Sequence, residues 1–213
     1  MDHDLCIKVI IIGDASAGKT SIMQVASKHE FNSVYNSTIG VDFGVLHYKM
    51  LDKVFKVQVW DTAGQERFLS IVRSYFKNIS GCILVYDVNN RTSFLNINKW
   101  LDDLHSYSSE EPIKILVGNK IDKGVRNRMV TSTEGIRLAN ENNMLFIETS
   151  AKNNININTI FEKLISKIHD DLMHGHLISG VSNGYGKKNK ISKLNISEGN
   201  HKKRKLFNCC NIS

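Results

Sequence analysis

The segment Gly-Asp-Ala-Ser-Ala-Gly-Lys-Thr at residues 13–20 constrains this chain more than any other feature. Its spacing is G-x-x-x-x-G-K-[ST], and it lies between an apolar run at 5–12 and helical periodicity at 20–28. Backbone N–H groups in such a loop, together with the positive end of the following helix, converge on an anion. Lys19 supplies a full charge to terminal phosphates, and the Thr20 hydroxyl suits Mg²⁺. A phosphate-binding turn is therefore predicted in preference to a chance glycine turn, with these candidate contacts: Asp14, Ala15, Ser16, Ala17, Gly18, Lys19, Thr20 and Ser21.

Apolar, β-rich runs alternate with amphipathic helical patterns over the first 172 residues. Further strands are expected at 42–51, 54–60, 82–86, 113–117 and 144–147, and further helices at 93–107, 133–142 and 157–172. The strands at 42–51 and 54–60 are joined by a short turn at Asp52 and Lys53, which predicts an edge hairpin. The alternation predicts an α/β fold, with a six-stranded, mostly parallel sheet, helices on both faces and one antiparallel edge strand.

The net charge of +7 lies entirely in the C-terminal part of the chain. Residues 1–173 hold 20 basic and 20 acidic side chains, whereas residues 174–213 hold eight basic side chains and one acidic one. Hydrophobic periodicity stops after Met173, so we expect one domain over 1–174 and a flexible basic tail over 175–213. This distribution disfavours nucleic-acid binding and favours an anionic membrane. The alternative for the basic run at 202–205 is a solvated or nuclear-import segment.

The four cysteines form two groups. Cys6 and Cys82 lie in apolar, strand-like runs and are expected to be reduced core residues in a cytosolic protein. Cys209 and Cys210 are adjacent near the C-terminus, where a lipid is expected in place of a disulfide. Read as C-a-a-X on Cys210, the terminal serine favours a farnesyl group, and an unmodified pair is the remaining alternative. The chain holds no apolar run long enough to span a bilayer.

A second phosphate-related motif, Asp-Thr-Ala-Gly-Gln-Glu, occupies residues 61–66 at the end of the second hairpin strand. Asp61 is placed to hold Mg²⁺ through water, although a strand-end helix cap is the structural alternative. Gly64 lets the backbone approach the γ-phosphate without a Cβ, and Gln65 is placed to orient an attacking water. We therefore take Lys19, Gly64 and Gln65 as candidate catalytic residues.

Two further motifs predict recognition of a guanine base. Asn-Lys-Ile-Asp at 119–122 follows the strand at 113–117, and the Asp122 carboxylate is suited to accept hydrogen bonds from guanine N1–H and N2–H₂. The aliphatic stem of Lys120 can cover the base. Ser-Ala-Lys at 150–152 follows the strand at 144–147, where the Ala151 N–H can reach guanine O6. Taken singly, these segments also fit a polar turn and a helix start, but all four motifs follow separate strands and can meet at one sheet edge.

These motifs resemble those of the Ras superfamily of small GTPases, and of the Rab family within it. The resemblance covers about residues 5–172 and the last two cysteines. It is carried by residues 13–20, Thr38, residues 60–66, 119–122 and 148–152, and by Rab-like stretches at 39–43, 56–60, 65–68 and 84–87.

The resemblance implies a membrane-bound GTP/GDP switch that hydrolyses GTP slowly and regulates vesicle trafficking. It implies Mg²⁺ held by Thr20, Thr38 and Asp61, and nucleotide contacts from Phe31, Tyr35, Asn119 and Lys152 in addition to those above. Ile39, Phe43, Trp60 and Tyr75 correspond to effector-reading residues, although without the family the three aromatics would be interpreted as core. The implied partners are an exchange factor, a GTPase-activating protein, a GDP-dissociation inhibitor and effectors of a monomeric protein.

The ending implies geranylgeranyl groups on Cys209 and Cys210, and hence the cytoplasmic face of an intracellular membrane with a cytosolic pool. Two rival functions remain. Asp122 disfavours an ATP-dependent phosphotransferase, and the presence of Lys19, Thr38 and Gln65 disfavours a binding module that has lost hydrolysis. The phosphate loop carries Ala15 and Ser16 where many members of the family have other small residues. Residues 74–78 also differ from the usual family sequence, and we expect this second difference to affect partner choice.

Overall fold

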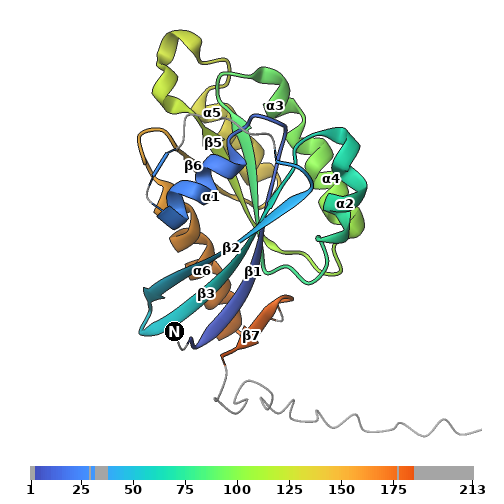
Figure 1. The fold of residues 1–213 in the computed structure, drawn as a ribbon, viewed down its shortest axis with the longest axis vertical. Helices are drawn as coiled ribbons and strands as arrows, with labels where there is room; N and C mark the ends of the chain where they lie inside the picture. The colour runs from blue at the N-terminus through green and yellow to red at the C-terminus, as the bar shows by residue number, and fades with distance from the viewer. Residues whose placement is uncertain (1–2, 29, 32–37, 177, 185–213) are drawn as a thin grey trace, which may run out of the picture.

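The computed structural model describes residues 3–28, 30–31, 38–176 and 178–184. A single sheet of seven strands runs through the molecule in the order β2-β3-β1-β4-β5-β6, with β7 also paired to β1 (Figure 1). All pairings are parallel except β2 with β3 and β1 with β7. The predicted α/β class is confirmed. The strands are β1 Leu5–Ile12, β2 Val41–Met50, β3 Lys53–Thr62, β4 Gly81–Asp87, β5 Ile113–Asn119, β6 Leu145–Glu148 and β7 Val181–Asn183.

Six α-helices cover the two faces of this sheet within the described residues, and two hydrophobic cores form between the layers. The helices are α1 Lys19–Lys28, α2 Leu69–Ser74, α3 Arg91–Leu95, α4 Ile97–Tyr107, α5 Ser132–Glu141 and α6 Ile157–Met173. Side chains alternate across β1, so that Ile7, Val9 and Ile11 pack with α1 and α6, whereas Ile10 and Ile12 pack with α2, α3 and α4. Because both faces are covered, the carboxyl ends of the strands and their loops remain the accessible edge for a ligand.

The predicted strands and helices occur close to their expected bounds, with three local differences. The hairpin turn is Leu51-Asp52, one residue earlier than expected, because both residues take positive φ values (52° and 55°) and Met50 pairs with Lys53. The helix expected at 93–107 is divided at Asn96 into α3 and α4. The short helix α2 was not predicted, because six residues give too little periodicity to detect.

The sheet has one strand more than the six expected, and this strand lies after residue 174, where we expected a flexible tail. β4 pairs with β1 only from Val9 onward, which leaves the first half of β1 without a partner on that side. β7 fills this gap by pairing antiparallel with residues Leu5 to Ile7, and Ile178 and Val181 pack against the core. Residues after 174 therefore contribute to the sheet and to the core. Residues 185–213, with the basic run and both terminal cysteines, lie outside the described residues.

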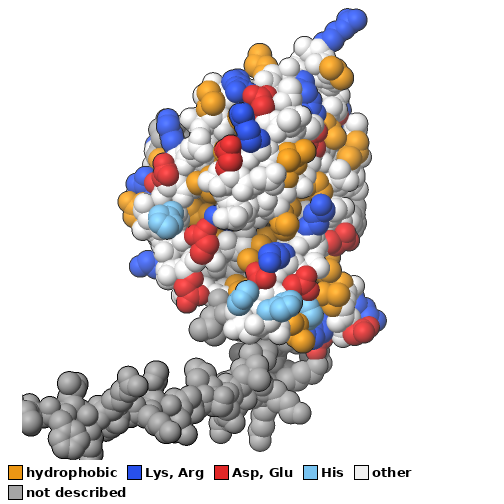
Figure 2. Space-filling model, turned by 180° about the vertical axis from the view of Figure 1, so that it is seen from behind, with side chains coloured by type: hydrophobic (Ala, Val, Ile, Leu, Met, Phe, Trp, Pro, Cys, Tyr) orange, Lys and Arg blue, Asp and Glu red, His pale blue; other side chains and the backbone are white. Residues whose placement is uncertain are grey.

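The surface of the described residues shows no dominant charge of one sign on the face seen in Figure 2, where acidic and basic side chains are interspersed. This agrees with the balanced charge of the first 173 residues. Cys82 is buried and Cys6 is half-buried, and both are free thiols. In the described part of the chain, no helix combines the length and apolar character needed to cross a membrane.

Candidate nucleotide and magnesium site

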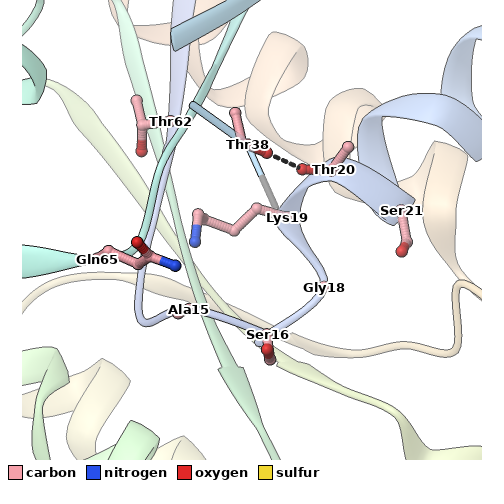
Figure 3. A pocket seen from close by; sticks show the side chains of 10 residues that line it. Ala15, Ser16, Gly18, Lys19, Thr20, Ser21, Thr38, Thr62 and Gln65 are labelled. Atoms are coloured by element: carbon pink, nitrogen blue, oxygen red, sulfur yellow. Dashed lines mark hydrogen bonds between the residues drawn. The ribbon is translucent and has the colours of Figure 1, made fainter. Parts of the chain in front are cut away.

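The phosphate loop connects β1 to α1 and forms the floor of a pocket at the carboxyl edge of the sheet. Figure 3 shows the Lys19 and Gln65 side chains extending into this pocket from opposite sides. Two segments distant in sequence, around Thr38 and Gly64, complete its wall. The lining residues are Ala15, Ser16, Gly18, Lys19, Thr20, Ser21, Thr38, Thr62, Gly64 and Gln65.

Lys19 is almost completely buried, with 5% of its surface exposed, and its ammonium group is hydrogen-bonded to the loop. Its Nζ donates hydrogen bonds to the carbonyl oxygens of Gly13 at 2.8 Å and Asp14 at 2.9 Å. Burial lowers the pKa of Lys19 to about 8, against the opposing effect of the Asp61 and Asp14 charges. A phosphate arriving here would be attracted by a charge that the loop carbonyls already hold in place.

Three oxygen-bearing side chains meet beside Lys19. The Thr20 hydroxyl donates to Asp61 Oδ2 at 2.5 Å and lies 2.7 Å from the Thr38 hydroxyl. Asp61 is fully buried, and its Oδ1 has no hydrogen-bond partner among the described residues. Burial raises the pKa of Asp61 to about 6, although the Thr20 hydrogen bond and the Lys19 charge oppose this. Hydroxyl and carboxylate oxygens are the ligands that Mg²⁺ prefers, and a buried carboxylate oxygen without a partner fits such an ion.

Gly64 brings residues 61–76, here called the second switch segment, into direct backbone contact with the phosphate loop. Its carbonyl accepts a hydrogen bond from Ala15 N at 3.1 Å. A Cβ at this position would lie 2.3 Å from Ala15 N and 2.5 Å from Lys19 Nζ. Only glycine therefore allows this approach, which also places the neighbouring Gln65 side chain over the pocket (Figure 3).

Asn119 holds the loops that follow β5 and β6 against the phosphate loop. Its Nδ2 donates to the carbonyl of Ala17 at 3.0 Å, and its Oδ1 accepts from Thr149 Oγ1 at 3.1 Å and from Ala151 N at 3.4 Å. Gly18 fits beside it because an added Cβ would lie 2.2 Å from Asn119 Nδ2. In this geometry Asn119 contacts protein, and the Ala151 N–H that we expected at guanine O6 faces Asn119.

Asp122 and Lys120 are held in place by contacts with two other loops, the one after β6 and the phosphate loop. The Ser150 hydroxyl donates to Asp122 Oδ1 at 2.6 Å, which fixes the carboxylate and leaves Oδ2 for another donor. Lys120 Nζ donates to the Ser16 carbonyl at 2.5 Å and pairs with Asp87 Oδ2 at 2.8 Å. Burial pushes the pKa of Asp87 upward, but hydrogen bonds from Lys120 and Asn89 outweigh it and bring the pKa below its usual range.

Three other predicted nucleotide contacts do not belong to the described lining of the phosphate pocket. Phe31 and Lys152 are described and exposed, and neither belongs to the pocket lining. Tyr35 lies outside the described residues.

Sequence reasoning missed four residues that shape the site: Thr62, Asp87, Asn96 and Trp100. Asp87 ends β4 and Thr62 ends β3 at the ligand edge, so the rule that detected Asp61 could have detected both. Asn96 and Trp100 give no such signal.

The four predicted effector residues lie on or near the surface of β2, β3 and α2. Ile39 is 81% exposed and Phe43 is 47% exposed. The Trp60 ring lies 4.8 Å from the Phe43 ring and 4.9 Å from the Tyr75 ring, measured between centroids. Phe43 is thus not the core residue that periodicity alone would suggest, and the three rings form one continuous group.

Comparison with known proteins identifies the family. The Ras family model matches residues 8–170. The chain belongs to the Ras family, as a Rab small GTPase. It is 41% identical over 183 residues to Ras-related protein RABA6b of Arabidopsis thaliana, covering 86% of this chain and 80% of that protein. It is 39% identical over 208 residues to Ras-related protein SEC4 of Saccharomyces cerevisiae, covering 98% and 93%. It is 41% identical over 172 residues to Ras-related protein Rab-10 of Caenorhabditis elegans, covering 79% and 85%.

Family membership makes this Rab protein a GTP hydrolase and a GTP/GDP switch of the vesicle-trafficking class. Guanine-nucleotide binding follows from the same family membership. The predictions of family and activity are confirmed.

Proposed function

We propose that this Rab protein is a lipid-anchored switch that recruits effectors to an intracellular membrane in its GTP state. The observation that carries the proposal is the meeting of Thr20, Thr38 and Asp61. Thr20 belongs to the phosphate loop, Thr38 to residues 35–43, here called the first switch segment, and Asp61 to the second switch segment. One bound ion and one γ-phosphate would then hold two surface segments together. Loss of the γ-phosphate on hydrolysis would release both, which is the order–disorder switch of such proteins.

Hydrolysis in this site is proposed to depend on positioning and charge. Lys19 supplies positive charge at the β- and γ-phosphates, and Gln65 holds the attacking water in line with the γ-phosphate. Mg²⁺, when bound by Thr20, Thr38 and Asp61, would neutralise developing charge on the phosphate oxygens. No arginine among the described residues lines the pocket. Turnover should therefore be slow until an activating protein supplies the missing positive charge.

The base is proposed to be read by Asp122, with Ser150 as its positioning partner. Ser150 occupies one carboxylate oxygen from the protein side, so the remaining oxygen can face the N1–H and N2–H₂ edge of guanine. Lys120 spans from this loop to the Ser16 carbonyl, which places its aliphatic stem across the space between base and phosphate loop. Phe31 and Tyr35 remain proposed contacts on the outer side of the nucleotide, and Lys152 and Ala151 on the base side.

The membrane anchor is proposed to be geranylgeranyl groups on Cys209 and Cys210. One lipid gives marginal attachment, whereas two give stable attachment. The basic residues at 202–205 would add roughly 1 kcal/mol per charge close to an anionic leaflet. β7 holds residues 181–183 on the sheet, so the segment that links the domain to these cysteines is proposed to start after β7 and not at residue 175. A GDP-dissociation inhibitor would maintain a cytosolic pool by covering these lipids.

The effector surface is proposed to be the group Ile39, Phe43, Trp60 and Tyr75, which joins both switch segments. Exposed apolar side chains that lie next to one another mark interaction sites on monomeric proteins. An exchange factor and an activating protein would act on the same segments, because both must reach the magnesium and phosphate positions.

Nucleotide competition tests the proposed function directly. Purified full-length protein loaded with labelled GDP is exposed to GTP, GDP or ATP with and without free Mg²⁺. We expect displacement by both guanine nucleotides, none by ATP, and faster GDP release when Mg²⁺ is chelated. Displacement by ATP as effective as by GTP would favour the phosphotransferase alternative and contradict the proposal.

A second experiment tests the anchor. Tagged protein is fractionated into membrane and cytosol for the wild type, for Cys209→Ser/Cys210→Ser, and for a control with Cys6→Ser. We expect the double variant to become cytosolic and the control to stay membrane-bound. Membrane retention of the double variant would contradict the proposed lipid anchor.

A further inference from the structure

Asp14 is the one acidic residue in the phosphate loop at 13–20, and its carboxylate is held by Trp100 of α4 and by Asn96, the N-cap of that helix. Asn96 Nδ2 donates to Asp14 Oδ2 at 2.7 Å, and Trp100 Nε1 donates to Asp14 Oδ1 at 2.9 Å. Each carboxylate oxygen therefore has its own donor, and both donors come from one turn of one helix segment. Such hydrogen bonds to an ionised acceptor are stronger than those between neutral groups.

A negative charge in this loop is unexpected, because the loop has to bind a nucleoside di- or triphosphate. Like charges at short range repel, and the effect grows as water is excluded. The contacts of Asp14 avoid this repulsion because its backbone carbonyl and its side-chain carboxylate face different sides of the loop. Its carbonyl oxygen faces inward and accepts from Lys19 Nζ at 2.9 Å, whereas its carboxylate is bound on the side of α4.

α4 holds the second switch segment as well as the phosphate loop. Arg73 of α2 pairs with Asp103 at 2.6 Å, and its guanidinium lies 4.8 Å from the centre of the Tyr107 ring. Trp100, Asp103 and Tyr107 are spaced at i, i+3 and i+7, so they share one face of α4. Figure 1 shows α2 and α4 side by side on the same side of the sheet.

The contacts of α4 surround a cleft of about 360 Å³, which lies between the back of the phosphate loop and α2. Its lining residues are Asp14, Ala15, Gly64, Leu69, Asn96, Lys99, Trp100 and Asp103. Ala15 and Gly64 line both this cleft and the phosphate pocket. The loop therefore separates the phosphate pocket from a second space behind it. On the side of this cleft, the two hydrogen bonds to Asp14 hold the loop, and the contacts with Gly64, Asn119 and Lys120 hold it elsewhere.

We propose that Asn96 and Trp100 are positioning residues for the phosphate site. They bind the Asp14 carboxylate away from the phosphates, so that the N–H groups of the loop face the ligand without a competing negative charge. This inference rests on the proposed phosphate contacts of the loop. It adds that the affinity for phosphates depends on two donors from a helix that contributes nothing to the pocket lining among the described residues.

Removal of one donor tests this proposal through a ligand-specific readout. We expect Trp100→Phe and Asn96→Leu each to speed GDP release by about tenfold, which corresponds to about 1.4 kcal/mol. The loss should grow with the number of phosphates, so the preference for GDP over GMP in competition should fall as well. An equal loss for GDP and GMP would indicate general loosening of the protein and would overturn the proposal.

A second experiment asks whether removal of the Asp14 charge rescues nucleotide binding in the Trp100 variant. In Asp14→Ala/Trp100→Phe no carboxylate remains to be released, so GDP release should be slower than in Trp100→Phe alone. Unchanged fast release in the double variant would overturn the proposal. Phe94→Leu is the matched control, because Phe94 lies in the same core as Trp100 without contacting Asp14. It should lower the unfolding temperature while keeping the GDP-to-GMP preference.

Failure of the proposed function would look different in the same experiment. If the wild type binds neither GDP nor GMP, the phosphate site itself is wrong. If the wild type prefers GDP normally and the Trp100 and Asn96 variants keep that preference, only the positioning proposal is wrong.

Discussion

The Thr20 hydroxyl donates a hydrogen bond to Asp61 Oδ2 at 2.5 Å across 41 residues of sequence. The contact ties the start of α1 to the end of β3, and Thr38 joins it from the first switch segment. Asp61 Oδ1 has no partner among the described residues although the residue is fully buried. A buried carboxylate oxygen left in this condition costs free energy unless a cation or water satisfies it.

We therefore expect Asp61→Asn to weaken the magnesium dependence of nucleotide binding. An amide keeps the size of the side chain but removes the negative charge, and a change of this kind near a metal costs about 10–100-fold in metal affinity. GDP release measured against free Mg²⁺ should show half-maximal retention at a correspondingly higher concentration. Asp52→Asn is the control, because Asp52 is exposed in the turn at the opposite end of the β2–β3 hairpin. Equal Mg²⁺ curves for wild type and Asp61→Asn would exclude the proposed ion site.

Replacement of Gln65 by leucine should separate binding from hydrolysis. Gln65 lines the phosphate pocket beside Gly64, and its amide is the polar group placed to orient water there. Leucine has nearly the same size but cannot hydrogen-bond, so single-turnover GTP hydrolysis should fall roughly tenfold or more. GDP and GTP affinities should stay within a few-fold of wild type. Normal turnover of the variant would remove Gln65 from the mechanism.

Asp122→Asn should change the preferred base from guanine to xanthine. The Ser150 hydroxyl can still donate to the amide oxygen, which would turn the amide nitrogen toward the base. That nitrogen would face the N2–H₂ donor of guanine, but it can donate to the 2-oxo group of xanthine. Competition binding should show a loss of at least about 100-fold for GDP and a gain for xanthosine diphosphate. If the variant Ser150→Ala/Asp122→Asn still prefers guanine over xanthine as the wild type does, Asp122 does not read the base.

Much of the site was predictable because each motif ends a strand. In a parallel sheet with both faces covered, the carboxyl ends of the strands meet at one edge, so the positions of residues 13–20, 61–66 and 119–122 follow from strand order. The period-two and helical patterns of buried side chains locate these strands to within one or two residues. Local spacing was thus sufficient for the loops that contact the ligand.

Features that depend on long-range pairing were not predictable in this way. β7 is three residues long and gains its stability from the open edge of β1, which exists only because β4 starts at Gly81 opposite Val9. Likewise, Asn96 and Trp100 read as ordinary helix residues until the fold brings them to Asp14. Neither relationship has a local pattern, since each partner lies more than 80 residues away in the chain.

The capping box of α5 predicts a pH-dependent part of the stability. Glu134 is bonded to the Thr131 backbone N–H and pairs with Arg91 at 2.6 Å, and these contacts lower its pKa from 4.5 to about 2. Because the folded-state pKa is depressed, the stabilisation is complete above about pH 4.5 and is lost as the pH falls toward 2.

Urea midpoints for wild type and Glu134→Gln should therefore differ at pH 6 and converge as the pH falls below 4. Glu141→Gln, on the same helix with Arg137 3.9 Å away, should track the wild type throughout. A constant difference between wild type and Glu134→Gln from pH 6 to pH 3 would rule out the charged cap.

β7 holds the segment after α6 against β1, far from the nucleotide site. Release of β7 should therefore lengthen the link between the domain and the terminal cysteines without affecting nucleotide binding. Val181 and Ile178 pack against the core, and Gly180 takes a φ of +70° with room for no Cβ, which would lie 2.3 Å from the Asn78 carbonyl oxygen. Val181→Asp should release the strand and cost about 1–3 kcal/mol of unfolding free energy. Hydrogen exchange should then lose protection at the backbone amides of residues 5–8 that pair with residues 180–183.

GDP affinity should remain unchanged in Val181→Asp, because β7 lies at the end of β1 opposite the phosphate loop (Figure 1). Ser182→Thr is the matched control. The Ser182 side chain is exposed and threonine favours strands, so protection and stability should both be retained. Full protection of residues 5–8 in Val181→Asp would mean that β1 needs no partner there. In that case the link to the terminal cysteines effectively begins at the end of α6, as the hydrophobic pattern alone suggested.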